Sequence, residues 1–350
     1  WLSDDWAYVD AGAVRFRVPT EGVTSWYDLV RGNVSFENEH IEDFVVRRAD
    51  GTATFFTANA VDDFELGITH VVRGEDLINV TPKVLMLRRA LGASDTPEFA
   101  HLPLIVNEQR KKLSKRRDDV ALESYRERGV LAPAMINYLA LLGWGPPDDI
   151  EVRPIEEIIS LFELTDVNPS SAMFDLKKLE AINAEYIRAM SPEDFSHALT
   201  PWIKEESWGA VVGADELRKV APLIQERTKV LSEGPAQLDF FFLTNPEFDE
   251  AAWTKVMRSD EAPLILSAVK TAVAEVEWDS TALHEMLRSI GEQHGMKLGK
   301  AQAPLRVAIT GRSVGPPLFE SMQFLGRETV VQRITAAQQK LDTNKPIDSP

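Results

Sequence analysis

The sequence contains no cysteine among its 350 residues. This absence excludes disulfide bridges, thiolate metal sites and a cysteine nucleophile. No apolar run approaches the roughly 18 residues that a membrane span requires, and the stretch from Leu139 to Trp144 is among the longest. No signal peptide is visible either. These absences predict a cytoplasmic enzyme or binding protein that has no membrane partner.

Positive charge is also scarce. The chain has 38 Lys and Arg against 55 Asp and Glu, which gives a net charge of −17 at pH 7. Such a balance argues against a nucleic-acid partner, because phosphate contacts need Lys and Arg. Net charge describes the average surface, however, and the octet RKKLSKRR at residues 110–117 contains six basic residues. The ordinary explanation of such a run is a solvated loop, and the alternative is a basic binding site.

The whole chain, with 350 residues, is long enough for two or three domains. Its first third has β and α/β patterns. Ala13–Val18 alternates apolar and charged residues, which predicts a half-buried strand. Two further predicted strands, Phe44–Arg48 and Thr52–Phe56, flank Asp50-Gly51. Asp-Gly between such runs is typical of a hairpin, because the turn needs positive φ.

A strand, a polar loop, a helix and a second strand follow. Ile68–Val72 predicts a buried parallel strand, Thr81–Leu91 a helix, and Leu102–Val106 another strand. In open α/β sheets ligands bind beyond the carboxyl ends of the strands. Arg73–Asp76 would lie at such an end. From about residue 118 onward the patterns predict almost only helices.

The basic octet contains Lys112-Leu-Ser-Lys-Arg116. Two lysines around a small hydroxyl residue suit triphosphate chemistry, because their ammonium groups neutralise charge on phosphate oxygens during adenylyl transfer. This segment resembles the signature usually written KMSKS of the class I aminoacyl-tRNA synthetases, in the variant typical of the glutamyl and glutaminyl branch.

Other segments match the glutamyl family in the same order along nearly the whole chain. They are Asn59–Asp63, Gly67–Leu77, Thr81-Pro82, Asn137–Trp144, Phe174–Leu179, Asn183–Ile187, Ala303–Gly311 and Pro317–Ser321. The chain is therefore similar to the bacterial-type glutamyl-tRNA synthetases.

The resemblance implies a fold of the class α/β plus all-α. The second part of a class I Rossmann-like catalytic domain would be followed by helical stem-contact and anticodon-binding domains. The implied parts are the β-rich end of an acceptor-binding connective insertion at 1–50, the second half of the nucleotide-binding fold with the KLSKR loop at 51–116, a stem-contact region at 117–190, an anticodon-binding region at 191–342, and a tail at 343–350.

The family also binds ATP through a His-x-Gly-His segment, which this sequence does not contain. The six histidines are His40, His70, His101, His197, His284 and His294, and no two lie within four residues of each other. The sequence also opens at Trp1 without a methionine. We therefore expect the chain to be N-terminally incomplete, and the fragment alone to be inactive.

For glutamate, the resemblance implies contacts from Phe55, Asn59 and Arg73. An arginine pairs with a carboxylate through two parallel hydrogen bonds, which suits Arg73. The residues alone leave open an ion pair of Arg73 with Asp63 or Glu75.

Phe55 departs from the family, which usually has a tyrosine there whose hydroxyl contacts the substrate. A phenylalanine can pack but cannot donate that hydrogen bond. Phe56 is the alternative equivalent if the alignment is shifted by one residue.

For ATP, the resemblance implies contacts from Asp76, Lys112, Ser114 and Lys115. Lys112 and Lys115 would be catalytic, with Lys115 nearest the transferring phosphoryl group. Asp76 is alternatively an acid of a helix first turn, favoured by the helix dipole, and Ser114 a turn cap. Mg²⁺ is expected to arrive with ATP and to be held largely by phosphates, so no metal site made of protein side chains is expected.

For tRNA, the candidates are Arg116, Arg306 and Arg312, followed by Lys297, Lys300 and Arg327. Arg312 comes after Gly311 and is predicted on a turn, where it would stack on or hydrogen-bond an anticodon base. A solvated surface charge is the ordinary explanation for any one of them.

These observations together predict ATP-dependent ligation of L-glutamate to tRNA(Glu) through glutamyl adenylate, by a monomeric glutamate–tRNA ligase. Two alternatives stay open. One is a glutaminyl-tRNA synthetase, although such enzymes usually carry β-barrels where this chain is helical. The other is a non-catalytic tRNA-binding fragment or paralogue.

Overall fold

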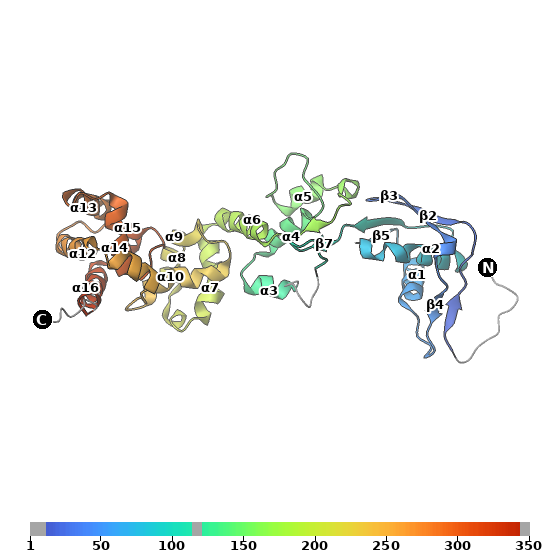
Figure 1. The fold of residues 1–350 in the computed structure, drawn as a ribbon, viewed down its shortest axis with the longest axis horizontal. Helices are drawn as coiled ribbons and strands as arrows, with labels where there is room; N and C mark the ends of the chain where they lie inside the picture. The colour runs from blue at the N-terminus through green and yellow to red at the C-terminus, as the bar shows by residue number, and fades with distance from the viewer. Residues whose placement is uncertain (1–11, 114–120, 344–350) are drawn as a thin grey trace. The chain divides into compact units, whose positions relative to one another are not determined.

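The computed structural model describes residues 12–113 and 121–343, which belong to two compact units. The first unit comprises Trp1–Ala121 and Met135–Leu179, and the second comprises Leu122–Ala134 and Glu180–Pro350. All strands within these described ranges belong to the first unit, whereas the described part of the second unit is helical (Figure 1). The predicted order of an α/β part followed by a helical part is confirmed.

The first unit is built around a mixed sheet of four strands in the order β3-β2-β6-β5. Its strands are β2 Val23–Asp28, β3 Gly32–Glu37, β5 His70–Gly74 and β6 Glu98–Leu102. β2 and β3 form an antiparallel hairpin, whereas β6 runs parallel to both β2 and β5. A separate antiparallel pair consists of β1 Val14–Phe16 and β4 Phe44–Arg47, with a 3₁₀ turn at Asn38–His40 between β3 and β4.

Two helices, α1 Phe55–Glu65 and α2 Thr81–Ala90, lie beside these strands (Figure 1). A 3₁₀ segment, Glu75–Val80, leads into α2, and Pro82 lies in its first turn, where a missing N–H costs nothing. The apolar residues of α2 are buried against side chains from the strands, among them Trp26, Phe44 and Phe99. This packing fixes the start of α2 beside the carboxyl ends of β5 and β6.

Two details of the predicted α/β part are wrong. Thr52–Phe56 is not a strand: a single bridge joins Arg47 to Ala53, and α1 begins at Phe55. The turn itself is present, with Gly51 at φ +86°. β5 is parallel as predicted but is not buried, because it lies at the edge of the sheet within the described ranges and leaves Val72 49% exposed.

The bounds of the predicted strand 102–106 are also wrong: β6 covers Glu98–Leu102, Pro103 and Leu104 follow it, and β7 is only Ile105–Val106. β7 pairs in parallel with β8 Ala172–Met173, so the region after residue 118 is not purely helical. The remaining elements of the first unit are α5 Ile155–Leu161, a 3₁₀ turn at Leu164–Asp166, and parts of α4 Ala132–Ala140 and α6 Leu176–Ala189, two helices that contain the boundaries between the units.

The second unit contains two apolar cores. The first core joins Phe195, Leu199, Leu217, Ile224 and Leu238, all 3% exposed or less. The elements around it are α3 Leu122–Glu127, α7 Pro192–Glu205, α8 Ala214–Val220, α9 Pro222–Gln225, α10 Gly234–Phe242 and the 3₁₀ turns Gly209–Val211 and Leu231–Glu233.

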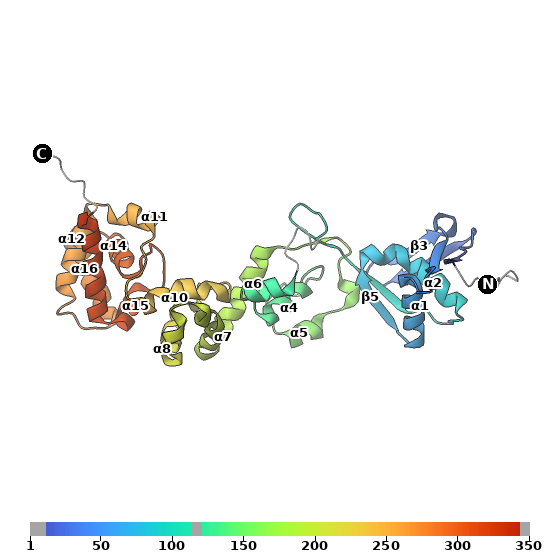
Figure 2. The same ribbon diagram turned by 90° about the horizontal axis from the view of Figure 1, so that it is seen from below.

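The second core joins Ile265, Leu283, Leu287, Leu305 and Ile334, all of them fully buried. Its elements are α11 Glu250–Ala252, a π-helical turn at Trp253–Met257, α12 Glu261–Ala272, α13 Ser280–Gln293, α14 Leu298–Thr310, α15 Leu318–Leu325 and α16 Arg327–Thr343. Figure 2 shows α12, α14 and α16 together at this end of the chain.

One buried arginine joins helices of the two cores. Arg333 on α16 is 1% exposed and donates to the carbonyls of Phe240 at 2.6 Å, Leu243 at 2.7 Å and Ile309 at 2.7 Å. Carbonyls in the last turn of a helix have no partner within that helix. The guanidinium therefore supplies the hydrogen bonds that the ends of α10 and α14 lack.

Candidate functional site

Three neighbouring strands of the first unit carry one polar side chain each toward the same edge of the sheet. Asp28 ends β2, His101 is the fourth residue of β6, and Arg73 is the fourth residue of β5. Arg73 and His101 are register partners across the parallel pair. The carboxyl ends of parallel strands are the usual place for a ligand in such sheets, so the topology itself assembles these groups there.

A continuous chain of hydrogen bonds joins the three side chains. Asp28 Oδ2 lies 2.5 Å from His101 Nδ1, and His101 Nε2 accepts from Arg73 Nε at 3.2 Å. Thr81, the first residue of α2, completes the arrangement. Its hydroxyl oxygen accepts from Arg73 Nη2 at 2.8 Å and lies 3.0 Å from His101 Nε2.

The environment fixes the protonation of the Asp28–His101 pair, in which both side chains are fully buried. Burial alone would raise the pKa of Asp28, but hydrogen bonds from His101, Val30 and Arg31 outweigh it, so this pKa lies below its usual value. Burial lowers the pKa of His101, against the opposing effect of Asp28. At neutral pH the pair is a carboxylate and an uncharged imidazole.

Arg73 is held as a cation beside this pair. Burial lowers its pKa below the usual value of an arginine, and the charges of Asp63 and Asp28 oppose this effect, so the guanidinium stays charged at neutral pH. Its central carbon lies 5.7 Å from the centroid of the Phe99 ring, which is a favourable position for a cation. Arg73 Nη1 has no hydrogen-bond partner among the described residues.

The alternative predicted for Arg73, an ion pair with Asp63 or Glu75, is wrong in the part of the chain that the structure describes. Glu75 pairs with Arg31 and also accepts the backbone N–H of Leu104, at 3.1 Å. Asp63 acts on Arg73 through its charge only, and burial raises the pKa of Asp63. Neither carboxylate forms an ion pair with Arg73 within residues 12–113 and 121–343.

The other two candidate glutamate contacts, Phe55 and Asn59, lie one helical turn apart on α1. Asn59 Oδ1 is buried and has no hydrogen-bond partner among the described residues. Phe55 is 53% exposed, whereas Phe56 packs on Phe44 with ring centroids 5.6 Å apart and contributes to the core. Of the two phenylalanines, Phe55 is therefore the one that a ligand can reach.

Asp76 contacts the beginning of the basic octet. Lys112 Nζ lies 2.8 Å from Asp76 Oδ2, and this hydrogen bond lowers the pKa of the carboxyl group. Asp76 also lies in the first turn of the 3₁₀ segment that leads into α2, which is the alternative surrounding predicted for it. Both side chains are about half exposed, at 46% for Asp76 and 55% for Lys112.

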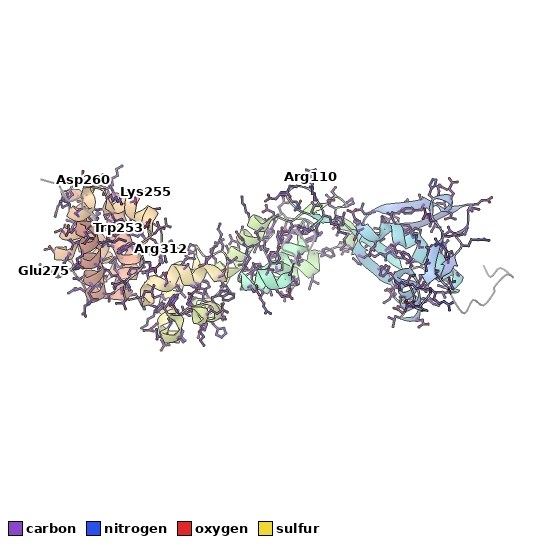
Figure 3. The ribbon with its side chains drawn as sticks, turned by 60° about the horizontal axis from the view of Figure 1, so that its bottom comes forward. Arg110, Trp253, Lys255, Asp260, Glu275 and Arg312 are labelled. Carbon is purple, nitrogen blue, oxygen red and sulfur yellow. The ribbon has the colours of Figure 1, made fainter. Side chains whose placement is uncertain are left out.

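The octet begins on a tight turn after β7. Asn107 Oδ1 accepts the backbone N–H groups of Gln109 and Lys111, and Arg110 between them has φ +58° (Figure 3). Lys112 then forms a bridge with Val106, which anchors the start of the octet to β7. The predicted contacts Ser114, Lys115 and Arg116 lie outside the described residues.

Arg312 and Arg306, the predicted tRNA contacts of the helical part, belong to the second unit. Gly311 ends α14 with φ +76°, so Arg312 lies on a turn as predicted (Figure 3). Its guanidinium pairs with both carboxylate oxygens of Asp239, which raises the pKa of Arg312. Arg306 donates to the carbonyl of Pro316 at 2.6 Å.

Arg312 also lines a cavity of about 320 Å³ in the second unit. The other residues around this cavity include Arg227, Gln237, Phe240, Thr310, Val314 and Pro316. Val314 is 75% exposed, and a second basic group, Arg227, donates to the carbonyl of Gly315. Apolar and basic groups therefore meet at one surface site, a combination that suits an unstacked base with its phosphate.

Sequence reasoning did not identify Asp28 and His101 as parts of the site. Their contact depends on β2 and β6 being neighbours, which no local pattern reveals. Arg73 follows the predicted strand 68–72, but His101 precedes the predicted strand 102–106, and only the observed bounds of β6 place it near the carboxyl end of a strand.

Metal and membrane features were also sought in the part of the chain that the structure describes. No group of three or more His, Asp or Glu side chains there could hold a metal ion. No helix there is long and apolar enough to cross a bilayer.

Comparisons with known proteins agree with this geometry. Residues 9–181 match the family model described as "tRNA synthetases class I (E and Q), catalytic domain", and residues 194–338 match "Anticodon binding domain". The glutamate–tRNA ligase of Frankia casuarinae is 54% identical over 332 residues, which are 94% of this chain and 70% of the relative. The ligase of Thermobifida fusca is 50% identical over 334 residues, with coverages of 94% and 70%.

A solved structure is similar as well. The crystal structure of a glutamate tRNA ligase from Elizabethkingia meningosepticum in complex with its amino acid gives a TM-score of 0.82 at 30% identity, over 94% of this chain and 68% of that chain. The predicted succession of a class I catalytic domain and a helical anticodon-binding domain is confirmed. This chain belongs to the glutamate–tRNA ligase family of the class I aminoacyl-tRNA synthetases.

Proposed function

We propose that this chain ligates L-glutamate to tRNA(Glu) in an ATP-dependent reaction that passes through glutamyl adenylate. The observation that carries the proposal is Arg73, a fixed guanidinium at the carboxyl ends of the strands whose Nη1 has no partner among the described residues. A guanidinium edge binds a carboxylate through two parallel hydrogen bonds. Arg73 therefore suits an acidic amino acid.

Two residues on α1 add to this recognition. Asn59 Oδ1 is a buried acceptor without a partner in the described ranges, which suits the ammonium group of an amino acid. Phe55 offers an exposed ring beside it. Glutamine is the poorer ligand for Arg73, because its carboxamide turns an NH₂ group toward donors.

ATP would be bound by Asp76, Lys112, Ser114 and Lys115, with Mg²⁺ carried by the phosphates as part of the substrate. A carboxylate oxygen of glutamate attacks the α-phosphorus, the bond to the β-phosphate oxygen breaks, and pyrophosphate leaves. Lys112 and Lys115 stabilise the charge that develops on these phosphate oxygens. A hydroxyl of the terminal tRNA ribose then attacks the acyl carbon and releases AMP, without a covalent enzyme intermediate.

The helical second unit would recognise tRNA. Arg312 and Arg306 are our candidates there, and Arg116 of the basic octet is a third. The ion pair with Asp239 fixes the plane of the Arg312 guanidinium beside a cavity, as recognition of a flat base requires. We further propose that the protein acts as a cytoplasmic monomer, with residues 117–190 as the stem-contact region and 191–342 as the anticodon-binding region.

A charging assay with labelled glutamate or glutamine, ATP, Mg²⁺ and total tRNA tests the proposal; it uses a protein that combines this chain with a His-x-Gly-His segment, because this chain alone is expected to be inactive. We expect label from glutamate, and not from glutamine, to be transferred to tRNA. Transfer of glutamine would favour the glutaminyl alternative. Binding of tRNA without transfer of either amino acid would favour a non-catalytic tRNA-binding protein.

A further inference from the structure

We propose that Asp28, His101 and Thr81 are positioning residues that fix the direction of every hydrogen bond around Arg73 and thereby determine which edge of its guanidinium meets the substrate. The inference rests on the proposed function, because it takes Arg73 as the group that binds the carboxylate of glutamate.

The direction of each hydrogen bond follows from the chemistry of the groups. A guanidinium can only donate, so His101 Nε2, 3.2 Å from Arg73 Nε, must be the unprotonated nitrogen of a neutral ring. The ring proton is then on Nδ1, which faces Asp28 Oδ2 at 2.5 Å. The Nδ1–H group of His101 donates to Asp28, because a carboxylate can only accept.

Thr81 is constrained in the same way. Its hydroxyl oxygen accepts from Arg73 Nη2 at 2.8 Å, so its own proton is free to point to His101 Nε2 at 3.0 Å. His101 and Thr81 together occupy the edge of the guanidinium formed by Nε and Nη2. Among the described residues, the one further hydrogen-bond partner of Nη2 is the carbonyl of Leu77, at 3.5 Å. The edge formed by Nη1 and Nη2 remains for a carboxylate.

Packing makes this arrangement rigid. Asp28, His101 and Thr81 are all 1% exposed or less, so water cannot replace a lost contact without opening the core. The His101 ring stacks on Phe99 with an interplanar angle of 9° and a centroid distance of 6.1 Å. Arg73 lies over the same ring. If the direction of the hydrogen bonds from Asp28 to Arg73 were reversed, a protonated His101 Nε2 would face the Nε–H of Arg73. Two buried donors that face each other are costly, so Arg73 would have to move.

Asp28→Asn in the full chain reverses that direction with almost no change of shape. Asp28 Oδ1 accepts the backbone N–H groups of Val30, Arg31 and His101, each at 3.1 Å. The amide oxygen must keep that place, so the introduced NH₂ group faces His101 Nδ1. The imidazole then carries its proton on Nε2 and sets a donor against Arg73 Nε. We expect the KM for glutamate to rise at least tenfold, while the KM values for ATP and tRNA change less than threefold.

Asp43→Asn is the matched control. Asp43 Oδ1 also accepts a backbone N–H, that of Val18 at 2.8 Å, but Asp43 has no contact with Arg73. The KM of the Asp43→Asn variant for glutamate should equal that of the unchanged protein. Nitrogen-15 NMR of the histidine side chains provides an independent measurement, because the protonated nitrogen of His101 should change from Nδ1 to Nε2 in Asp28→Asn only.

Two pairs of variants keep the inference testable if Asp28→Asn does not fold. His101→Gln can still present an acceptor near the place of Nε2, whereas His101→Asn can reach only toward Asp28. Thr81→Ser keeps the hydroxyl that Thr81→Val removes. We expect His101→Asn and Thr81→Val to raise the KM for glutamate at least fivefold more than their partners do. Equal effects within each pair would mean a structural role and would overturn the inference.

Arg73→Lys separates this inference from the proposed function. If it raises the KM for glutamate but the other variants do not, the positioning role is wrong and the role of Arg73 stands. If it leaves that KM unchanged, Arg73 does not bind the substrate and both proposals fail. Effects of Asp28→Asn and Arg73→Lys that are not additive in the double variant would support the positioning role.

Discussion

Phe55 differs by one oxygen atom from the tyrosine that glutamyl-tRNA synthetases usually carry at this position. We expect Phe55→Tyr to lower the KM for glutamate about 2- to 10-fold, because a single added hydrogen bond contributes about 0.5–1.5 kcal/mol. The exposed position of Phe55 leaves room for the hydroxyl. Charging at varied glutamate concentration, with saturating ATP and tRNA, measures the effect.

Phe56→Tyr is the control for this substitution. Phe56 packs against Phe44 in the core of the first unit, so an added hydroxyl there gains no substrate contact. If Phe56→Tyr lowered the KM for glutamate and Phe55→Tyr left it unchanged, the alignment with the family would be shifted by one residue.

Burial of His101 predicts a pH dependence of stability. The imidazole has a pKa of 6.5 in the unfolded chain and a lower one in the folded chain. Between these two values the unfolded chain binds more protons, so the free energy of unfolding falls as the pH drops below 6.5. One proton gives a slope of at most about 1.4 kcal/mol per pH unit.

Urea denaturation between pH 7 and pH 5 measures this slope. The slope should become smaller in His101→Gln and remain in His70→Gln, because His70 is an exposed histidine of the neighbouring strand. An unchanged slope in His101→Gln would assign the pH dependence to other groups.

The sequence predicts single residues of the site where the signal is local. Arg73 follows an apolar run and therefore lies near the end of a strand, and the family motif gives Lys112. Asp28 and His101 are 73 residues apart and meet only because β2 and β6 are adjacent. A contact of that kind depends on strand order, which one sequence does not reveal.

At the scale of elements, the strongly patterned segments α2 and β5 are found within two residues of their predicted positions, whereas β6 ends at Leu102, where the predicted strand begins. The segment Thr52–Phe56 is the instructive error. Its β-branched and aromatic residues favour a strand, but the Thr54 hydroxyl bonds to the carbonyl of Val45 at 2.8 Å and Phe56 turns into the core from the first turn of α1. Tertiary packing thus outweighs the local preference.

Arg333 donates to three carbonyls at the ends of α10 and α14 in the second unit. We expect Arg333→Met to lower the free energy of unfolding by about 3–5 kcal/mol, because two buried carbonyls and one partly buried carbonyl lose their donor. Burial lowers the pKa of this arginine to about 10, so it is still a cation at neutral pH. Thermal or denaturant unfolding followed by circular dichroism measures the loss.

Arg327→Met is the control on the same helix. Arg327 donates to the carbonyls of Ala274 and Val276, but these contacts are exposed and water can replace them. We expect little change in stability. Equal losses in both variants would mean that burial is not what makes Arg333 important.

At the scale of the whole molecule, the residues predicted to bind glutamate and ATP belong to the first unit, whereas Arg306 and Arg312, two of those predicted to bind tRNA, belong to the second. The chain carries a net charge of −17, so tRNA must be bound through a few well-placed cations. We expect Arg312→Gln to raise the KM for tRNA about 10- to 100-fold, as the loss of a charged hydrogen bond would. The KM for glutamate should stay unchanged.

Arg218→Gln is a suitable comparison for Arg312→Gln. Arg218 belongs to the same unit and pairs with Asp215 at 3.0 Å, and its side chain is 51% exposed. An equal effect of both substitutions on the KM for tRNA would mean that general charge, and not the site at Arg312, determines binding. Melting curves of both variants exclude unfolding as the cause.

The contacts of Arg333 also define an interval during synthesis of the chain. Arg333 is 93 residues from Phe240, and ribosomes add roughly 5–20 residues per second, so α10 exists for roughly 5–20 s before the arginine that completes it has been made. During that interval the apolar side chains of Leu238 and Phe240 have no α16 near them. The second unit therefore cannot complete these hydrogen bonds until α16 has left the ribosome.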